Sequence, residues 1–417
     1  MRQPETIESL YLDFDGFFAS VMQQAFPRLR GRPVGVVPFD VSNAKHTAVI
    51  ACSKEAKALG VSNVMRVPDA LSICPELVLV SQRPDLFRRA HNALLNEIHC
   101  VLPIETIKSI DELSCTLSPT EVRHPKELAA NIKARLADNV GEHVTCSIGM
   151  APNRLLAKIA CKVGKPNGVT IWPPECLPGP LLKMTFEDVP GIGTRMEKRL
   201  NAAGIWTLKD LLETAPKQMR GLWRSVNGER LWYSLHGYHL HAQTTKRGMF
   251  GHARVLPPDW RSIERALSTS RLLLTKAARR MRRENFYAGK LWLWLDVNSG
   301  GWFGQRNLHF VNDDQACLSA LMLLWEQARA QSNGKLWVFR VGVTLVDLVP
   351  ANNRQLDLFL ADDAERRRWE ALTNSIDALN ARFGKRVVTI GPWTPPPGDY
   401  AGGKIAFNRI PDEEDFW

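Results

Sequence analysis

The sequence lacks the features of a membrane protein, a secreted protein or a domain with a structural zinc site. Among its 417 residues no run approaches the roughly 20 consecutive apolar residues that a membrane-spanning helix needs. The first ten residues, MRQPETIESL, are polar and contain no apolar signal core. The eight cysteines lie far apart without a Cys-x-x-Cys pair, which argues against a zinc site and a disulfide framework. We therefore expect a soluble, cytoplasmic protein in a reducing compartment.

The chain instead carries an excess of positive charge, which is concentrated in one segment. In total, 54 Lys and Arg residues stand against 43 Asp and Glu residues, a net charge of +11. Residues 241–290 alone hold twelve Lys or Arg and three acids. Such a concentration favours a surface that follows the phosphates of a nucleic acid, although a solvated basic surface is the alternative.

Hydrophobic periodicity divides the chain into regions of different composition. Strand and helix patterns alternate up to about residue 184, and residues 185–243 read as short helices joined by glycine turns. Residues 249–349 follow the order β-α-β-β-α-β, with helices expected at 261–284 and 314–331. A tail follows, with one amphipathic helix at 364–383 and no internal repeat. The length and these changes predict several domains of mixed α/β class.

Two segments place carboxylates where metal-dependent phosphate chemistry needs them. The run LYLDFDGFFASV, residues 10–21, delivers Asp13 and Asp15 to the end of an apolar strand, on one face of it. The segment SIDEL adds Asp111 and Glu112 about a hundred residues later. Neighbouring strand residues point to opposite faces, so both can serve one site only if the chain turns there. Carboxylates gathered in this way typically hold divalent cations.

Two enzyme classes begin with such a segment. Asp-Phe-Asp-Gly resembles the opening of haloacid-dehalogenase-type phosphatases, in which the first Asp attacks phosphorus. In that class Thr or Val follows the glycine, and a Gly-Asp-x-x-x-Asp motif comes later. Here Phe17 follows Gly16, and the later motif is missing from the sequence. A nucleic-acid polymerase, in which the carboxylates hold metal, is therefore favoured.

Four segments in order resemble the Y-family translesion DNA polymerases of the DinB/UmuC type: YLDFDGFFASV, SIDEL, SIGMAPNRLLAKIACKVGKPNG and DVPGIGTRMEKRLNAAGIWTLKDLL. The resemblance runs over nearly the whole chain and implies a right-hand polymerase. Its palm with inserted fingers would span 1–184, with the fingers at about 33–92. A helix-hairpin-helix thumb would span 185–243, a little finger 246–349, and a C-terminal tail 350–417.

The resemblance also assigns roles to individual residues. Asp13, Asp111 and Glu112 become the catalytic, metal-binding carboxylates, and the Phe14 carbonyl becomes a backbone ligand. They would hold two Mg²⁺ ions, with Mn²⁺ as a possible substitute. Asp15 is interpreted as structural support, and Phe18 as the steric gate against the ribose 2′-hydroxyl. The nucleotide-binding set is Phe17, Phe18, Lys54, Lys57 and Lys165.

One departure from the family pattern concerns the triphosphate. Lys54-Glu55-Ala56-Lys57 stands where the family commonly has Tyr-Glu-Ala-Arg. A lysine is a point charge without the bidentate fork of arginine, so it holds phosphate with less control of orientation. The effect of this exchange on activity is left open by the sequence.

Further segments predict contacts with DNA and with a clamp. Gly191 and Gly193 permit a tight turn whose amides would meet a DNA phosphate at a helix N-terminus. Lys246, Arg247 and Arg254 lie on the segment that runs beside the template backbone in the family. RQLDLF fits the bacterial sliding-clamp-binding motif through its residues Gln355, Leu356, Leu358 and Phe359.

The predicted activity is template-directed addition of deoxynucleotides to a primer 3′-hydroxyl, in DNA damage bypass and the SOS response. The expected partners are primer-template DNA, dNTPs, the sliding clamp and accessory mutagenesis subunits. The alternative is a catalytically inactive relative that acts as a clamp-bound DNA-binding scaffold. Retention of the three carboxylates argues against it, while Lys54 and Lys57 keep it open. Whether helix 364–383 packs on the core or binds another protein is also open.

Overall fold

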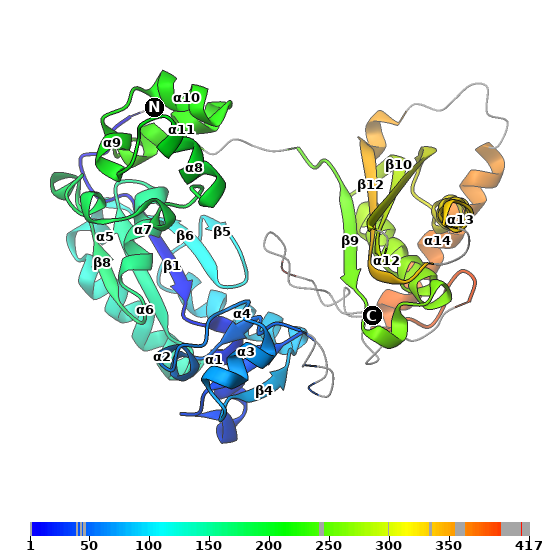
Figure 1. Ribbon diagram of the computed structural model, residues 1–417, viewed down its shortest axis with the longest axis horizontal. Coiled ribbons are helices and arrows are strands. Elements are labelled where there is room, and N and C mark those ends of the chain that lie inside the picture. Colours follow the sequence, from blue (N-terminus) through cyan, green and yellow to red (C-terminus); the bar gives the residue numbers. More distant parts are fainter. Residues whose placement is uncertain are drawn as a thin grey trace. The chain divides into compact units, whose positions relative to one another are not determined.

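The computed structural model describes residues 2–38, 41, 44, 47–241, 246–298, 300–332, 336–354, 363–392 and 410. The chain forms two compact units, one up to Gln243 and one from Thr244 onward, and Ile410 belongs to the first. Figure 1 draws residues 2–241 in blue to green and residues 246–392 in green to orange-red. All eight cysteines are free thiols. Within the described ranges, no helix is both long and apolar enough to cross a bilayer.

The first unit is built on a five-stranded sheet in the order β5-β6-β1-β7-β8. Its strands are β1 (Ser9–Phe14), β5 (Thr106–Ile107), β6 (Glu112–Thr116), β7 (Cys146–Ala151) and β8 (Val169–Ile171). The apolar residues of β1 explain its central position, because β6 and β7 pair with it on both sides in antiparallel register. The aspartates at its end are thereby fixed to the middle of the sheet.

Helices cover both faces of this sheet. They are α1 (Phe17–Ala25), α4 (Pro84–His99), α5 (Pro119–Arg123), α6 (Pro125–Asn139) and α7 (Arg154–Val163). Leu10, Leu12 and Phe14 of β1 share a core with α4 and α6, whereas Tyr11 packs with α7. Since side chains alternate along a strand, Asp13 lies on the α7 face with Tyr11. Gly149 of β7 lets α7 approach, because a Cβ there would lie 2.1 Å from the Ala157 carbonyl oxygen.

A smaller sheet has the order β3-β2-β4, and the Lys-Glu-Ala-Lys segment lies on a helix that follows its strand β3. Its elements are β2 (Val34–Val37), β3 (Ala51–Cys52), α2 (Lys54–Ala58), α3 (Val67–Ile73) and β4 (Val78–Ser81). Ser53 begins α2 by accepting a hydrogen bond from the Ala56 amide. Short 3₁₀ turns connect parts of the first unit: η1 (Pro27–Leu29), η3 (Pro174–Cys176), η4 (Leu181–Lys183) and η5 (Phe186–Asp188).

Residues 185–241 are helical, as the sequence predicts: α8 (Thr194–Ala202), α9 (Leu208–Leu212), α10 (Pro216–Trp223) and α11 (Val226–Leu235). They share an apolar core with α7. Asn153 fastens them to the sheet region. Its Oδ1 accepts from the Leu156 amide to begin α7, and its Nδ2 donates to the carbonyls of Ser234 and Tyr238 at 2.8 and 3.1 Å.

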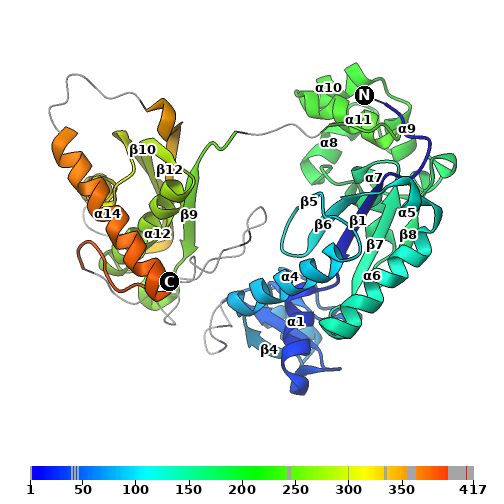
Figure 2. The same ribbon diagram turned by 180° about the vertical axis from the view of Figure 1, so that it is seen from behind.

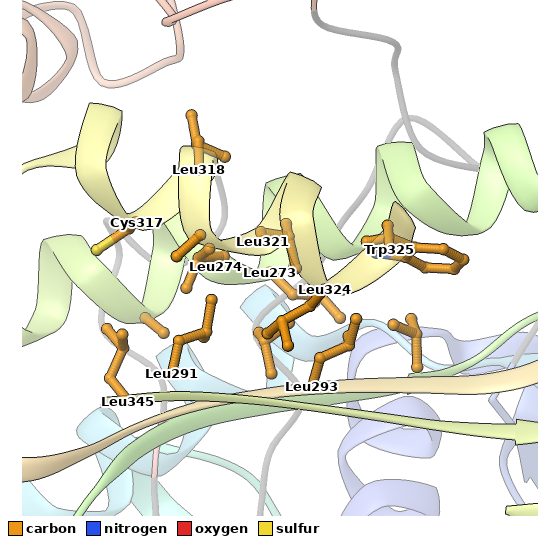
Figure 3. Close-up of a cluster of buried hydrophobic side chains, with 14 of the residues drawn as sticks. Leu273, Leu274, Leu291, Leu293, Cys317, Leu318, Leu321, Leu324, Trp325 and Leu345 are labelled. Atoms are coloured by element: carbon orange, nitrogen blue, oxygen red, sulfur yellow. The ribbon is translucent and has the colours of Figure 1, made fainter. Parts of the chain in front are cut away.

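The second unit confirms the predicted β-α-β-β-α-β order. It consists of β9 (Phe250–Val255), η6 (Pro258–Trp260), α12 (Ile263–Arg283), β10 (Phe286–Val297), β11 (Gly300–Val311), α13 (Asp314–Gln331), β12 (Val338–Pro350) and η7 (Ala351–Asn353). The antiparallel sheet has the order β11-β10-β12-β9. Both helices cover one face, and Figure 3 shows their leucines directed toward those of the sheet (Leu273, Leu274, Leu321 and Leu324; Leu291, Leu293 and Leu345).

The C-terminal helix α14 (Asp363–Phe383), orange in Figure 2, packs on this second unit. The buried Arg282 of α12 donates to Asp377 of α14 at 2.7 Å and to Asp314 of α13 at 2.8 Å. This network answers the question that the sequence left open, because α14 is part of the second unit's own structure.

Candidate active site

The three predicted metal-binding carboxylates lie at one end of the pair β1 and β6. Asp13 stands directly opposite Glu112 in the antiparallel register. Asp111 precedes β6 in a turn, in which the amides of Lys108 and Ser109 both donate to the Glu112 carbonyl, at 2.9 and 3.2 Å. The Phe14 amide donates to the Asp111 carbonyl at 2.8 Å. This turn is what allows two adjacent acidic residues to approach Asp13 together.

Each carboxylate has a hydrogen-bond donor from the protein. The Lys165 ammonium forms an ion pair with Asp13, and the Ser109 hydroxyl donates to Asp111. Lys158 of α7 lies 2.7 Å from Oε1 of Glu112 and 3.1 Å from the Tyr11 hydroxyl. With the carboxylates turned toward these donors, no three acidic, His or Cys side chains converge as a metal-ligand set in the part of the chain that is described.

The electrostatics of this end of the sheet favour a bound cation. Burial raises the pKa of Asp13 to about 7, and the neighbouring Asp111 and Glu112 carboxylates add to the rise, while Lys165 opposes it. Lys165 therefore does not fully compensate the Asp13 carboxylate for its burial and for its acidic neighbours. The available donors are carboxylate and carbonyl oxygens, which suit Mg²⁺. In charge and donor type, the site fits a divalent cation.

Asp15 belongs to the support of the site. Its Oδ1 accepts from the Ser147 hydroxyl at 2.8 Å, and its Oδ2 accepts from Thr145 at 3.0 Å and from the Asn167 amide at 2.9 Å. The carboxylate thus ties the end of β1 to the turn that carries Lys165. These contacts agree with the interpretation of Asp15 as structural support.

The turn between β1 and α1 brings Lys57 close to the site. Gly16 adopts a φ of +57°, and a Cβ there would lie 3.2 Å from the Cys52 carbonyl oxygen and 4.0 Å from the Lys57 ammonium. Glycine is therefore favoured for both its conformation and the close approach. Lys57 and Lys54 are both exposed on α2.

The proposed gate residue rests on a buried aromatic ring. Phe18 is half-buried, and its ring centroid lies 4.7 Å from that of Phe87 in α4. Phe17 is buried in the core, so its side chain is not available to a nucleotide and only its backbone can be. The packing of Phe18 on Phe87 fixes the position of the exposed part of its ring.

Sequence reasoning missed two residues that position the carboxylates. One is Lys158. The other is His91 of α4, whose Nδ1 donates to the Ile110 carbonyl at 2.7 Å, next to Asp111. Its Nε2 is buried and has no partner within the described ranges, so the ring is neutral with its proton on Nδ1. The spacing of His91 with the buried Phe87 and Leu94 is the signal that could have identified it as an inward-facing polar residue.

The predicted phosphate contact at Gly191 and Gly193 lies on an exposed turn. Gly191 has a φ of +98°, and a Cβ on either glycine would meet no atom within 4 Å. Helix α8 begins directly after Gly193 without a side-chain cap. The open space and the uncapped amides are compatible with a DNA phosphate, and the contact stays a prediction.

The three predicted DNA contacts in the second unit differ in their surroundings. Lys246 is exposed, whereas Arg247 forms an ion pair with Glu284 at 2.8 Å. Arg254 on β9 stands opposite the buried Val341, which places it on the sheet face that α12 covers. The clamp-motif residues 355–359 lie outside the described residues.

The open face of the second sheet carries an aromatic surface that sequence reasoning missed. It is formed by Trp292 and Trp294 of β10, Phe303 of β11 and Arg340 of β12, and Phe303 is 58% exposed. The Arg340 guanidinium lies 4.5 Å from the centroid of the Trp294 ring. Gly342 makes room for this indole, because a Cβ there would lie 2.0 Å from its Cε2. We call these four residues the aromatic face.

Comparison with known proteins gives consistent matches over both units. Residues 12–162 match the impB/mucB/samB family, and residues 247–358 match the C-terminal domain of that family. The DNA polymerase IV of Moorella thermoacetica is 31% identical over 392 residues, which cover 91% of this chain and 94% of that protein. The DNA polymerase IV 1 of Bacillus subtilis is 28% identical, covering 91% of this chain and 92% of its own length.

Solved structures share the fold. A Y-family DNA polymerase chimera matches with a TM-score of 0.69 at 23% identity, covering 82% of this chain and 99% of its own. An insertion ternary complex of Dbh DNA polymerase matches with a TM-score of 0.56 at 23% identity, and the match covers 84% of this chain and 100% of that chain. These matches confirm the fold class predicted from the sequence.

Proposed function

The chain belongs to the impB/mucB/samB family, and on that premise we propose that it is a template-directed DNA polymerase of the translesion type. It adds deoxynucleotides to a primer 3′-hydroxyl. The observation that carries this proposal is the placement of Asp13, Asp111 and Glu112 at one end of two paired strands, with lysines paired to Asp13 and Glu112.

The residues that would hold the divalent metal are Asp13, Asp111 and Glu112, together with the Phe14 carbonyl. When bound there, two magnesium ions would lower the pKa of the primer hydroxyl and neutralise charge on the departing pyrophosphate. The chain's own contribution is to hold the acids at fixed positions. The turn at 108–112 fixes Asp111 and Glu112, and strand pairing fixes Asp13.

The nucleotide is proposed to lie between the carboxylates and α2. Lys165 supplies positive charge beside Asp13, Lys57 supplies it beside the Gly16 turn, and Lys54 lies on the same helix as Lys57. Ammonium groups hold phosphate oxygens through charge-assisted hydrogen bonds, which supports their role as triphosphate ligands. Phe18, supported by Phe87, stands as the gate that excludes a ribose 2′-hydroxyl.

Primer-template DNA is proposed to contact both units. The amides at Gly191 and Gly193 and the cations of Lys246, Arg247 and Arg254 would meet phosphates, without reading the base sequence. The aromatic face, with Arg340 against Trp294, has the composition of a surface on which nucleic-acid bases stack. Phosphate contacts and stacking would together hold DNA without sequence preference.

The experiment that tests the activity compares the wild type with Asp111→Ala in primer extension, on an undamaged template with magnesium and dNTPs. We expect the wild type to extend the primer and the variant to lose extension, while primer-template affinity changes less than about twofold, because an acidic residue contributes no phosphate contact. Lack of extension by the wild type with magnesium and with manganese, despite tight DNA binding, would favour the inactive scaffold.

Binding to the bacterial sliding clamp is proposed from the motif at 355–359, and action in DNA damage bypass from the family. Gln355 and the apolar Leu356, Leu358 and Phe359 would enter a hydrophobic pocket of the clamp. Replacing Leu358 and Phe359 together by Ala should weaken clamp binding at least tenfold in a pull-down or titration. Unchanged affinity would show that the motif is a coincidence.

A further inference from the structure

Three basic residues, Lys108, Arg154 and Lys158, lie together beside Glu112, and we call them the basic cluster. Arg154 and Lys158 are one turn apart on α7, so their side chains share one face of that helix. The Lys158 ammonium lies 2.7 Å from Oε1 of Glu112. Lys108 belongs to the turn before β6, and its amide donates to the Glu112 carbonyl at 2.9 Å. Two separate segments of the first unit therefore bring positive charge to the same carboxylate.

The charges of the basic cluster act on one another. Burial lowers the pKa of Lys108 below its usual value, and the charges of Arg154 and Lys158 lower it further, although Glu105 opposes them. Like charges that disfavour one another in this way are close in space. A phosphate group placed among them would relieve this repulsion, because its oxygens accept charge-assisted hydrogen bonds from several cations at once.

Two members of the basic cluster keep their charge available to a ligand. Lys158 is already paired with Glu112. Lys108 and Arg154 form no ion pair with any residue that the structure describes. Arg154 is exposed at the start of α7, and Lys108 is half-buried. Neighbouring cations without an acidic partner are typical of surfaces that follow phosphates.

The basic cluster is distinct from the lysines proposed to hold the triphosphate. Lys165 is paired with Asp13, and Lys57 lies beside the Gly16 turn. The basic cluster is attached to Glu112 instead. In an in-line transfer between two metals, the attacking and leaving oxygens stand on opposite sides of the phosphorus. With Lys165 and Lys57 on the side of the triphosphate, the cations beside Glu112 are left for the strand that brings the attacking hydroxyl.

The start of α7 also connects the site to the other predicted phosphate contact of the first unit. Asn153, directly before Arg154, donates two hydrogen bonds that fasten α7 to the helical region 185–241. The exposed turn at Gly191 and Gly193 belongs to that region. Arg154 thus lies where the sheet that carries the carboxylates is joined to the helices that carry this turn.

We propose that the basic cluster binds the phosphate of the last primer nucleotide, with Lys108 and Arg154 as its direct contacts. This phosphate belongs to the same nucleotide as the 3′-hydroxyl, so it comes close to the carboxylates whenever the hydroxyl does. Lys158 then links the bound phosphate to Glu112. The proposal rests on the proposed polymerase function, and it concerns the position of the primer end. Contacts of this kind place DNA without reading its bases.

The test measures the affinity of the full chain for a primer-template whose primer ends in a dideoxynucleotide, with magnesium and the next dNTP present. The variants are Lys108→Met and Arg154→Met. The matched controls, Lys126→Met and Arg123→Met, remove exposed cations of α6 and α5, which follow the opposite end of β6. We expect each variant to weaken binding about fivefold or more, through loss of a hydrogen bond to a charged group, and each control to change it less than about twofold.

A modified primer identifies the phosphate that is bound. A methylphosphonate in place of the last primer linkage removes the charge of that phosphate. On this primer, Lys108→Met and Arg154→Met should bind as tightly as the wild type, because the contact is already lost. The same replacement further from the primer end, or in the template strand, should leave the losses in both variants as large as on unmodified DNA.

Losses of equal size on the charged primer and on the methylphosphonate primer would overturn the proposal. So would losses that disappear only when the template strand is modified, because the contact would then belong to the template. Arg154→Lys keeps the charge and should retain most of the affinity, whereas a loss as large as that of Arg154→Met would contradict a phosphate contact. Since the dideoxy end prevents extension, unchanged affinity in both Met variants refutes only the primer contact, whereas lack of primer extension by the wild type refutes the proposed activity.

Discussion

The packing of Phe18 on Phe87 makes sugar selectivity the most informative property to perturb. Phe87 is fully buried, and its ring centroid lies 4.7 Å from that of Phe18 and 6.4 Å from that of Phe17. Phe18→Ala removes the gate itself. We expect it to reduce the preference for deoxynucleotides over ribonucleotides on the order of a hundredfold, since the shape of a pocket wall distinguishes substrates by roughly this factor.

The second variant, Phe87→Leu, keeps the gate and weakens only its support. An aromatic pair contributes about 0.5–1.5 kcal/mol beyond its buried area. Loss of this energy would raise the fraction of molecules in which the Phe18 ring is displaced by about two- to twelvefold. The expected loss of selectivity has the same size, and it is smaller than that for Phe18→Ala because the gating ring remains.

The assay is single-nucleotide primer extension, with kcat/KM measured for a dNTP and for the matching rNTP. Phe250→Leu is the control, because Phe250 is equally buried but belongs to the core of the second unit. It should lose stability to a similar extent and keep the wild-type selectivity. Unchanged selectivity in Phe18→Ala would refute the assignment of the gate. Equal losses in Phe87→Leu and Phe250→Leu would refute the role of Phe87 as its support.

Two further predictions concern the residues that sequence reasoning missed. Burial lowers the pKa of His91 below its usual value, so the unfolded chain takes up this proton first. Stability from His91 is then present above about pH 6.5 and is lost as the pH falls, by at most about 1.4 kcal/mol per pH unit. His91→Gln should flatten the pH dependence of chemical denaturation between pH 6.5 and 5, and an identical slope would contradict the lowered pKa of His91. In DNA binding, Trp294→Ala should lower the affinity by about fivefold or more and leave the slope of log affinity against log salt concentration unchanged. Lys246→Ala should instead reduce that slope by about 1. The reverse pattern would contradict stacking of bases on Trp294.

The alternation of residues made the second unit predictable from sequence. In β10 the leucines at 291, 293 and 295 are buried, while Trp292 and Trp294 between them lie on the open face. Such a pattern predicts a strand with one covered face directly. The strand boundaries were harder to predict. The sequence pattern indicates a strand only at residues 307–311, whereas β11 begins at Gly300.

The candidate site was only partly predictable, for a physical reason. The types and order of the acidic residues are visible in the sequence, but the register that places Asp13 opposite Glu112 is set by strand pairing between distant segments. The turn at 108–112 depends on two amides that share one carbonyl, which no residue type dictates. Lys158 reads as an ordinary lysine of an amphipathic helix, and only the packing of α7 on β1 directs it to Glu112.

The count of basic residues in 241–290 overstates the charge that this segment offers to DNA. Lys276, Arg280 and Arg282 are buried in the second unit, and Arg247 forms an ion pair with Glu284. A buried or paired cation releases few counterions from DNA, so it adds little to the salt-dependent part of binding. Interactions other than those between charges must then contribute more of the affinity for DNA. The aromatic face of the second unit presents the residues that could make them. For this reason the salt dependence of DNA binding should be weaker than twelve cations in fifty residues indicate.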